Sequence, residues 1–393
     1  MSRRRHVNTR LRKPLERSVR SGHPWLYREA LQPFEAEPGS VVSVLDERGR
    51  VLCRGLADSG PIAVRVFTAL DEPLDDALIA RRIDSAFALR ARVVPEQTDA
   101  YRLLHGEGDR LPGVVCDRYG AAAVLKLDGE AACAWRSELI EALRAPLAAL
   151  GVEALLVREG KKHESHVELA YGPRPPDELI VLERGMQLCA SLWHGQKTGL
   201  FLDHRESRAR VRGLARGARV LNLYGYTGGF SVAAGLGGAA HVTTVDIAAP
   251  ALALAERSWA ANELPSERHA TAATDVPEVL DALASERARF ELIVADPPSF
   301  APSERSKDAA LASYEKLHAA CLRLLQPGGY YLAASCSSHV GAAEFDDTLR
   351  KGAQAARRVL QVLERSSAPP DHPRLLAFPE GDYLKVVLSR DMR

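Results

Sequence analysis

The second half of the chain constrains the fold most strongly, because short apolar segments alternate there with helical patterns. Strand-like runs lie at 220–223, 242–245, 292–295, 330–336 and 384–388, and helices are predicted between them. This alternation is typical of βαβ units, which build a parallel sheet covered by helices. We therefore expect an α/β domain whose ligand lies beyond the carboxyl ends of the strands.

The first half predicts two other kinds of structure. Alternating side chains at 41–44 and 62–66, with turns between them, are typical of short strands in a small barrel. A helix predicted over 74–92 opens an α+β segment, which closes near the proline-rich break at 172–176. The predicted domains are a β-barrel at 1–72, a small α+β domain at 73–184 and the α/β domain at 185–393.

Charge is distributed unevenly along the chain, although its sum is close to zero. The chain has 52 Lys and Arg against 51 Asp and Glu, yet residues 1–70 hold 13 basic and 7 acidic side chains, and residues 71–190 hold 15 and 21. A basic head of this kind favours a polyanionic partner such as nucleic acid. Arg supplies 43 of the basic residues, so a general coding bias towards Arg is the alternative explanation.

Composition and cysteine spacing indicate a folded protein of the cytoplasm. The residues are 46% hydrophobic and 26% charged, which excludes a wholly disordered chain. The six cysteines form no C-x-x-C pair, so we expect reduced thiols and no metal site. No apolar run approaches the roughly 20 residues of a membrane span, and the basic N-terminus lacks the apolar core of a signal peptide. We therefore expect no membrane partner.

A glycine-rich turn follows the first strand of the α/β region. It reads Tyr-Gly-Tyr-Thr-Gly-Gly at 224–229, between a strand and a helix, so a ligand can approach bare backbone N–H groups. Asp246 ends the next strand, where a carboxylate can accept hydrogen bonds from ribose hydroxyls. The glycine spacing differs from G-x-G-x-x-G, which disfavours a nicotinamide dehydrogenase. We predict a nucleoside ligand, and glycines that only serve a tight turn are the alternative.

Two reactive groups are predicted at the ends of neighbouring strands. Asp296 begins the sequence Asp-Pro-Pro-Ser-Phe, whose prolines fix the backbone, so its carboxylate suits the exocyclic amine of a flipped base, with Phe300 as a stacking face. Cys336 ends the next strand, where a thiol can act as a nucleophile. A plain turn at Asp296 and an inert buried thiol at Cys336 are the structural alternatives.

A polar segment at 195–205 precedes the sheet and crowds glycines with charged side chains. Lys197 or Arg205 can meet the carboxylate of a ligand. An ion pair between Asp203 and Arg205 explains the same residues equally well, and their spacing leaves both interpretations open.

Together these motifs resemble the PUA-containing class I S-adenosylmethionine-dependent ribosomal RNA methyltransferases of the RlmI type, which make 5-methylcytosine in large-subunit rRNA. The resemblance spans nearly the whole chain, and its first motif is similar to the opening of the family's RNA-binding PUA domain. The matching segments are 21–27, 106–113, 117–119, 196–205, 226–230, 371–373 and 379–385. It implies a Rossmann-like methyltransferase domain, an N-terminal PUA β-barrel and a small α+β middle domain.

The resemblance also implies roles for single residues. Cys336 falls on the family's nucleophile, and Asp296 contacts both the methyl donor and the target base. Pro298 stands where other cytosine-5 RNA methyltransferases usually carry a second Cys, so the base that removes the C5 proton is unassigned. The implied S-adenosylmethionine site consists of Lys197, Thr198, Arg205, Tyr224, Gly225, Tyr226, Thr227, Gly228, Asp246, Asp275 and Asp296.

Our hypothesis is methylation of cytosine C5 in 23S rRNA, with the Cys336 thiolate adding to C6. N-methylation of guanine or adenine with an inert Cys336 is one alternative, and a non-catalytic RNA-binding protein is another. Trp25 offers a base-stacking face, although we favour a core position for it, and a homodimer is left open. The residues predicted to meet RNA are Arg3, Arg4, Arg5, Arg10, Arg12, Lys13, His23 and Trp25.

Overall fold

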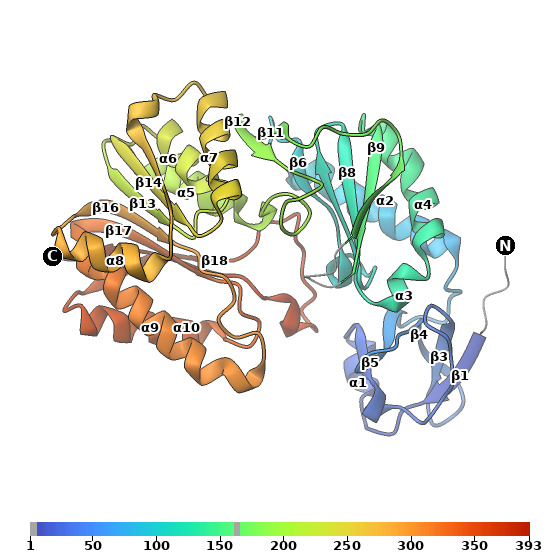
Figure 1. Cartoon of the computed structure of the whole chain (residues 1–393). Helices are drawn as coiled ribbons and strands as arrows, with labels where there is room; N and C mark the ends of the chain where they lie inside the picture. The colour runs from blue at the N-terminus through green and yellow to red at the C-terminus, as the bar shows by residue number, and fades with distance from the viewer. Residues whose placement is uncertain (1–5, 161–165) are drawn as a thin grey trace. The chain divides into compact units, whose positions relative to one another are not determined.

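The computed structural model describes residues 6–160 and 166–393 (Figure 1). The chain forms two compact units: the first contains Met1–Asp177 and Pro370–Gly381, and the second contains Glu178–Pro369 and Asp382–Arg393. A short segment near the C-terminus thus belongs to the first unit, although the residues on both sides of it belong to the second. Within the described ranges, no helix has the length and apolar character needed to cross a membrane.

The N-terminal part of the first unit is a five-stranded sheet in the order β1-β3-β4-β5-β2. β1 pairs with β3 in parallel, and the other neighbours are antiparallel. Its elements are β1 (His6–Arg10), α1 (Glu16–Arg20), β2 (Trp25–Tyr27), β3 (Val41–Leu45), β4 (Val51–Ala57) and β5 (Ile62–Thr68). The strands predicted at 41–44 and 62–66 are confirmed, because Val42, Val44 and Val66 fill the core of this sheet.

The rest of the first unit is a second five-stranded sheet in the order β10-β9-β8-β7-β6, and only β8 and β9 are parallel neighbours. Its elements are α2 (Asp76–Val93), β6 (Ala100–His105), β7 (Val114–Tyr119), β8 (Ala122–Leu127), α3 (Glu130–Cys133), α4 (Arg136–Ala149), β9 (Ala154–Glu159) and β10 (His166–Tyr171). The helix predicted over 74–92 is confirmed as α2. Asp75 caps it by accepting from the Leu78 N–H at 2.9 Å.

The returning segment, as we name Pro370–Gly381, is bound to the first unit by buried charges. Arg90, 2% exposed, donates to both carboxylate oxygens of Asp109 and to the backbone oxygen of Asp371, each at 2.7 Å. The Asp371 carboxylate accepts from the backbone N–H of Arg102 at 3.0 Å. Because an unpaired buried charge costs several kcal/mol, these bonds tie the segment to α2 and β6.

The second unit contains a seven-stranded sheet in the order β15-β14-β13-β16-β17-β19-β18, beside the hairpin of β11 (Leu179–Glu183) and β12 (Met186–Ala190). The first five strands in this order are parallel, and β19 runs antiparallel to both neighbours. The strands are β13 (Arg219–Leu223), β14 (His241–Asp246), β15 (His269–Ala273), β16 (Phe290–Ala295), β17 (Leu325–Ser335), β18 (Leu360–Ser366) and β19 (Lys385–Asp391). The order reverses between β13 and β16, which is where such sheets bind ligands.

Helices cover both faces of this sheet (Figure 1). Alternate strand residues divide between two cores: Val220 and Val294 pack with α5, α6 and α7, whereas Leu221 and Ile293 pack with α8, α9 and α10. The helices are α5 (Arg205–Leu214), α6 (Gly229–Leu236), α7 (Ala249–Ala261), α8 (Val276–Ser285), α9 (Lys307–Leu324) and α10 (Ala342–Ala355). The α/β prediction for this region is confirmed.

Three local features differ from the sequence-based expectations. β15 was not predicted, because its sequence His-Ala-Thr-Ala-Ala carries small side chains, and β18 was not predicted, because most of its residues are exposed. The strand predicted at 330–336 begins earlier, because β17 starts at Leu325; within this extension the pairing with β16 shifts register and Gly328 has φ +75°.

Stability is expected to fall on mild acidification, because His318 stays neutral in the folded protein. Burial lowers the pKa of His318 to about 3 from the usual 6.5. The unfolded chain therefore binds one more proton below pH 6.5, and the free energy of unfolding falls there by about 1.4 kcal/mol per pH unit from this group alone. Chemical denaturation at pH 7, 6 and 5 measures the slope.

The matched variant is His318→Asn, which leaves an amide near the Tyr331 hydroxyl that His318 Nδ1 contacts at 2.8 Å. The variant has no titrating group at position 318, so the number of protons taken up on unfolding in this range is expected to be lower by about one, and the pH dependence of its stability correspondingly weaker. An equal slope in both proteins would contradict the prediction.

Candidate active site

The turn after β13 has an uncommon backbone conformation. Tyr224 and Tyr226 have φ values of +58° and +45°, in a region that costs L residues roughly 1–2 kcal/mol each. Between them, Gly225 packs so closely that an added Cβ would lie 2.4 Å from Cγ2 of Thr244. The Tyr226 N–H donates to Oδ2 of Asp246 at 2.8 Å. The bare glycine and the carboxylate therefore hold the turn in place.

A buried polar network supports this turn. Asn222 Nδ2 donates to Ser231 Oγ at 2.8 Å, and Ser231 Oγ lies 2.6 Å from Thr244 Oγ1. Thr244 Oγ1 is in turn 2.7 Å from Nε2 of His269, whose ring stacks on Trp259 with centroids 4.5 Å apart. The network joins β13, α6, β14, β15 and α7, so the position of the turn depends on all five elements.

A cavity of about 310 Å³ lies at the ends of β13, β14, β16 and β17. Apolar side chains form part of its wall, including Phe230, Val276 and Ile247, which is 77% exposed. Nine of the residues predicted to bind the cofactor or act in catalysis line it: Lys197, Tyr224, Gly225, Tyr226, Thr227, Asp246, Asp275, Asp296 and Cys336.

Four other predicted residues do not line the cavity. Thr198 and Arg205 are 1% and 0% exposed behind its wall. Gly228 has φ +74°, and an added Cβ there would lie 2.5 Å from Cβ of Ala255 in α7. Phe300 packs on the Tyr314 ring with centroids 4.8 Å apart, so its aromatic face is occupied by the protein itself.

Asp296 has an ionisable partner that the sequence analysis did not single out. Nε2 of His204, a residue only 3% exposed, lies 3.1 Å from Oδ2 of Asp296. Burial alone lowers the pKa of His204, but the Asp296 and Asp203 carboxylates outweigh it, so the net shift is upwards from 6.5. His204 stands inside the polar segment at 195–205, which was the available signal.

Cys336 follows β17 and is half-buried in the cavity. Burial raises the pKa of its thiol, the Asp296 charge raises it further, and the Lys197 ammonium opposes them. Lys197 itself lies over the rings of Phe201 and Tyr383 at 5.4 and 5.9 Å. The thiol is therefore protonated near neutral pH, and the cation beside it favours ionisation.

Hydrogen bonds join the loop of Cys336 to the loop of Asp296. Ser337 Oγ lies 3.1 Å from Ser299 Oγ and 3.0 Å from the Tyr314 hydroxyl. The buried Lys385 Nζ donates to the backbone oxygens of Ser337 at 2.5 Å and Tyr383 at 2.8 Å. The two reactive loops are therefore held as one body.

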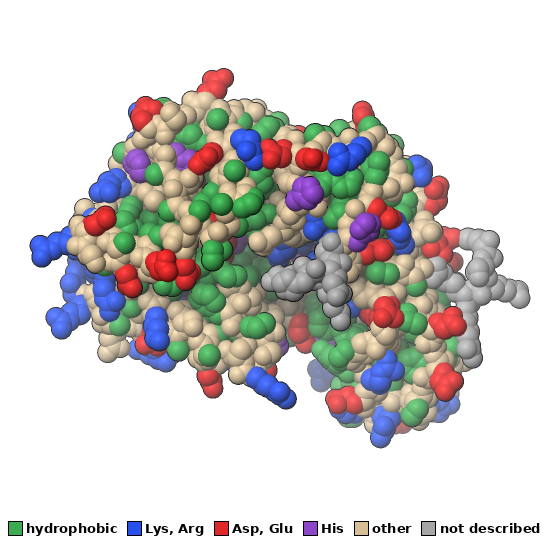
Figure 2. All heavy atoms as spheres, in the orientation of Figure 1, with side chains coloured by type: hydrophobic (Ala, Val, Ile, Leu, Met, Phe, Trp, Pro, Cys, Tyr) green, Lys and Arg blue, Asp and Glu red, His purple; other side chains and the backbone are tan. Residues whose placement is uncertain are grey.

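The residues predicted to meet RNA lie in the first unit. Arg10, Arg12 and Lys13 are exposed, and Lys13 pairs with Glu29 at 2.5 Å; Arg3, Arg4 and Arg5 fall outside the described residues. His23 and Trp25 both pack on Phe378, with centroids 5.7 and 4.6 Å away, and Trp25 Nε1 donates to Glu107 at 2.9 Å. On the face drawn in Figure 2, acidic and basic side chains are interspersed over this unit.

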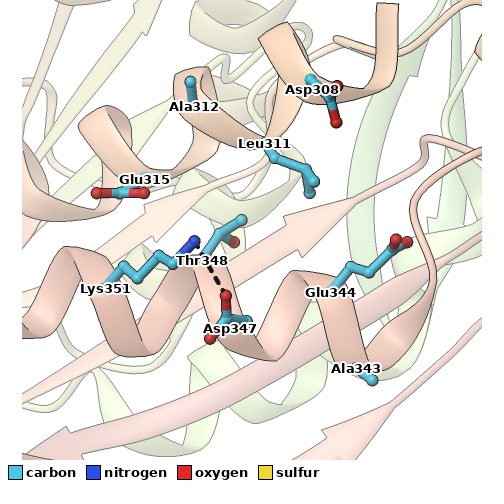
Figure 3. Close-up of a pocket in the computed structure, with 9 residues that line it drawn as sticks. All are labelled: Asp308, Leu311, Ala312, Glu315, Ala343, Glu344, Asp347, Thr348 and Lys351. Carbon is cyan, nitrogen blue, oxygen red and sulfur yellow. Dashed lines mark ion pairs between the residues drawn. The ribbon is translucent and has the colours of Figure 1, made fainter. Parts of the chain in front are cut away.

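A second hollow lies between α9 and α10 and has a different character (Figure 3). Its charged walls include Glu344, which pairs with Lys307 at 2.7 Å, and Asp347, which pairs with Lys351 at 3.2 Å. Across residues 6–160 and 166–393, no group of three or more His, Cys, Asp or Glu side chains is placed to hold a metal ion. The reactive groups therefore gather in the first cavity.

The first cavity fits S-adenosylmethionine. Asp246 presents carboxylate oxygens beside a glycine turn, as a ribose requires. The exposed Ile247 and the buried Val276 line the cavity with apolar groups, which suit a flat base next to Asp275. Lys197 supplies a cation for a carboxylate. The cavity lies where the order of the parallel strands reverses, and it contains groups suited to the ribose, base and carboxylate of S-adenosylmethionine. This combination is typical of the class of Rossmann-like methyltransferases.

Comparisons with known proteins agree with this class. Residues 124–388 match the S-adenosylmethionine-dependent methyltransferase family, and residues 10–69 match a PUA-like domain. A ribosomal RNA large subunit methyltransferase of Deinococcus radiodurans is 39% identical over 97% of this chain and 96% of its own, and ribosomal RNA large subunit methyltransferase I of Tolumonas auensis is 35% identical over 97% and 98%.

Solved structures share the fold. A putative SAM-dependent methyltransferase from Streptococcus mutans has a TM-score of 0.86 and 24% identity, covering 98% of this chain and all of its own. A second structure, a methyltransferase complexed with SAH, gives the same TM-score and identity over 98% and 99%. The chain therefore belongs to the S-adenosylmethionine-dependent methyltransferase family, in the branch that contains the ribosomal RNA large subunit methyltransferases above.

Gly225→Ala is expected to weaken S-adenosylmethionine binding by at least about tenfold, because the new methyl group pushes the turn away from Thr244. Titration calorimetry measures the affinity. The control is Gly213→Ala in α5, where an added Cβ meets nothing within 4 Å and alanine favours the helix. Equal affinities of the two variants would contradict the role of Gly225.

Proposed function

We propose that this protein methylates C5 of a cytosine in 23S ribosomal RNA. It is an S-adenosylmethionine-dependent methyltransferase by family, and relatives that match 97% of the chain are named for large-subunit ribosomal RNA. The observation that carries the choice of C5 is a thiol, Cys336, in the same cavity as the Asp296 carboxylate. C5 of cytosine is too weak a nucleophile to react unaided, and a thiol supplies the activation.

When bound, S-adenosylmethionine supplies an electrophilic methyl group. We assign its ribose hydroxyls to Asp246, its adenine to the region of Asp275, and its carboxylate to Lys197, all of which line the cavity. Thr198 and Arg205 are buried and do not line the cavity, so we assign them no contact with the cofactor.

The protein's own groups then act on the cytosine ring. The Cys336 thiolate adds to C6 and forms a C–S bond, and the displaced electron pair makes C5 enamine-like. Asp296 accepts a hydrogen bond from the exocyclic amine and so orients the ring. After C5 has taken the methyl group, loss of its proton restores the C5–C6 double bond and expels the Cys336 thiolate.

RNA that carries 5-fluorocytosine at the target is expected to trap this reaction, because fluorine cannot leave as the C5 proton does. Wild-type protein should form a covalent RNA adduct visible by denaturing electrophoresis, more rapidly at higher pH because the pKa of Cys336 is raised. Cys336→Ala should form none, and methylation should fall at least about 1,000-fold. The control is Cys133→Ala, which alters a partly exposed thiol of the first unit. Full activity of Cys336→Ala would refute the nucleophile.

N-methylation of a guanine or adenine is the second candidate, favoured by one observation: the raised pKa of Cys336 leaves the thiol protonated near neutral pH. Asp296 would then accept a hydrogen bond from the amine that is methylated. Mass-spectrometric analysis of nucleosides from rRNA methylated by the protein distinguishes 5-methylcytosine from an N-methylated purine.

We further propose that the basic head binds the phosphates of RNA. The three predicted domains then have separate roles: residues 1–72 bind RNA, residues 73–184 connect the other two domains, and residues 185–393 catalyse methyl transfer. Support comes from the PUA-like match at 10–69 and from the exposed Arg10, Arg12, Arg17 and Arg20. Contacts of this type position RNA without reading its sequence.

RNA affinity is therefore expected to fall steeply with salt. Arg12→Gln should weaken binding at low salt and reduce the slope of log K against log [salt] by about one, because one phosphate contact is lost. Filter binding at several salt concentrations measures this. Arg350→Gln, an exposed change in α10, is the control. A slope unaffected by Arg12→Gln would exclude this residue from the RNA contact.

A further inference from the structure

The surroundings of His204 carry an inference beyond the proposed function. His204 ends a short turn before α5, and its ring is enclosed by the Phe230 ring at 5.3 Å and by the loop that follows β16. Its Nε2 lies 3.1 Å from Oδ2 of Asp296. Its Nδ1 is buried and has no hydrogen-bond partner among the described residues.

The charges around His204 favour its protonated form. Asp296 faces it from the loop after β16, Asp203 precedes it in the chain, and Arg208 faces it from α5. The Arg208 guanidinium is matched by Glu183, which accepts from it at 2.7 and 2.5 Å. Two carboxylates therefore act on the imidazole, while the Arg208 cation is neutralised by its own partner, Glu183. This explains the raised pKa of His204 despite complete burial.

We propose that His204 is a positioning residue that occupies Oδ2 of Asp296 and fixes the orientation of this carboxylate, so that Oδ1 is left as an acceptor for the exocyclic amine of the target base. The inference rests on the proposed role of Asp296 at that base. An ionised, oriented carboxylate accepts hydrogen bonds and donates none, which suits an amine and opposes a carbonyl oxygen in the same place.

The test uses two replacements that separate position from charge. His204→Gln keeps an N–H donor near Oδ2 but carries no charge, whereas His204→Leu removes both. Single-turnover methylation of 23S rRNA from a strain lacking this protein is expected to slow by about 10-fold for His204→Gln and about 100-fold for His204→Leu, the effect of losing a hydrogen bond to a charged group. His241→Gln, at the amino end of β14, is the control.

The pH profile gives a readout that a purely structural role does not move. The neighbouring carboxylates raise the pKa of His204, so its charge is lost only as the pH rises past that value, whereas glutamine has no charge to lose. The ratio of the wild-type rate to the His204→Gln rate should therefore fall as the pH rises. Superimposable profiles, or a wild-type rate for His204→Leu, would overturn the inference. Calorimetric S-adenosylmethionine binding shows that each variant is folded. In an Asp296→Asn background, the methylation rates with histidine and with glutamine at position 204 should be equal.

Nitrogen-15 NMR of labelled histidine tests the charge directly. The ring of His204 is expected to lose its proton at a higher pH in the wild-type protein than in Asp296→Asn, because the Asp296 carboxylate raises the pKa of His204. Equal titration of His204 in the two proteins would overturn the inference without any reference to the reaction product. An N-methylated product, in contrast, would refute only the C5 proposal. The pH dependence of the rates would still test whether His204 positions Asp296.

Discussion

The catalytic unit depends on how closely the turn after β13 approaches β14. Only a residue without a side chain fits at Gly225, and the two left-handed tyrosines beside it persist because Asp246 and a buried chain of hydroxyl groups hold them. Backbone strain of this kind survives only where the surroundings over-determine it. The turn thereby brings the ends of β13 and β14 to the wall of one cavity.

The reactive groups opposite the turn rely on a second rigid connection. Asp296 and Cys336 come from loops 40 residues apart in the sequence, yet Ser299, Ser337 and Tyr314 link the loops through hydroxyl groups. Lys385, from the last strand, binds the backbone beside the thiol. A displacement of one loop is therefore transmitted to the other, which keeps the carboxylate and the thiol in fixed positions relative to each other.

Local patterns predicted the α/β region, the glycine turn at 224–229, Asp246, Asp296 and Cys336, because strand periodicity and strand-end motifs depend on neighbours in sequence. Asp275, which also lines the cavity, came from the family resemblance. His204 could not be singled out in this way: its role comes from Asp296, 92 positions later. Phe300 was expected to face a base, but Tyr314 occupies its ring, a packing choice made by a distant helix. The membership of the returning segment in the first unit could not be predicted from local patterns either, because Asp371 contacts Arg90, which lies 281 positions earlier.

The first unit contains a segment that is translated near the end of the chain, so it cannot be completed before most of the second unit has been synthesised. Arg90 and Asp109 are made early, but their partner Asp371 leaves the ribosome only after most of the second unit has been translated. The first unit is therefore incomplete until the chain is almost finished, and no single cut releases it intact. Until then Arg90 has Asp109 as its partner but lacks the backbone oxygen of Asp371, so this buried hydrogen bond forms only after most of the second unit has been made.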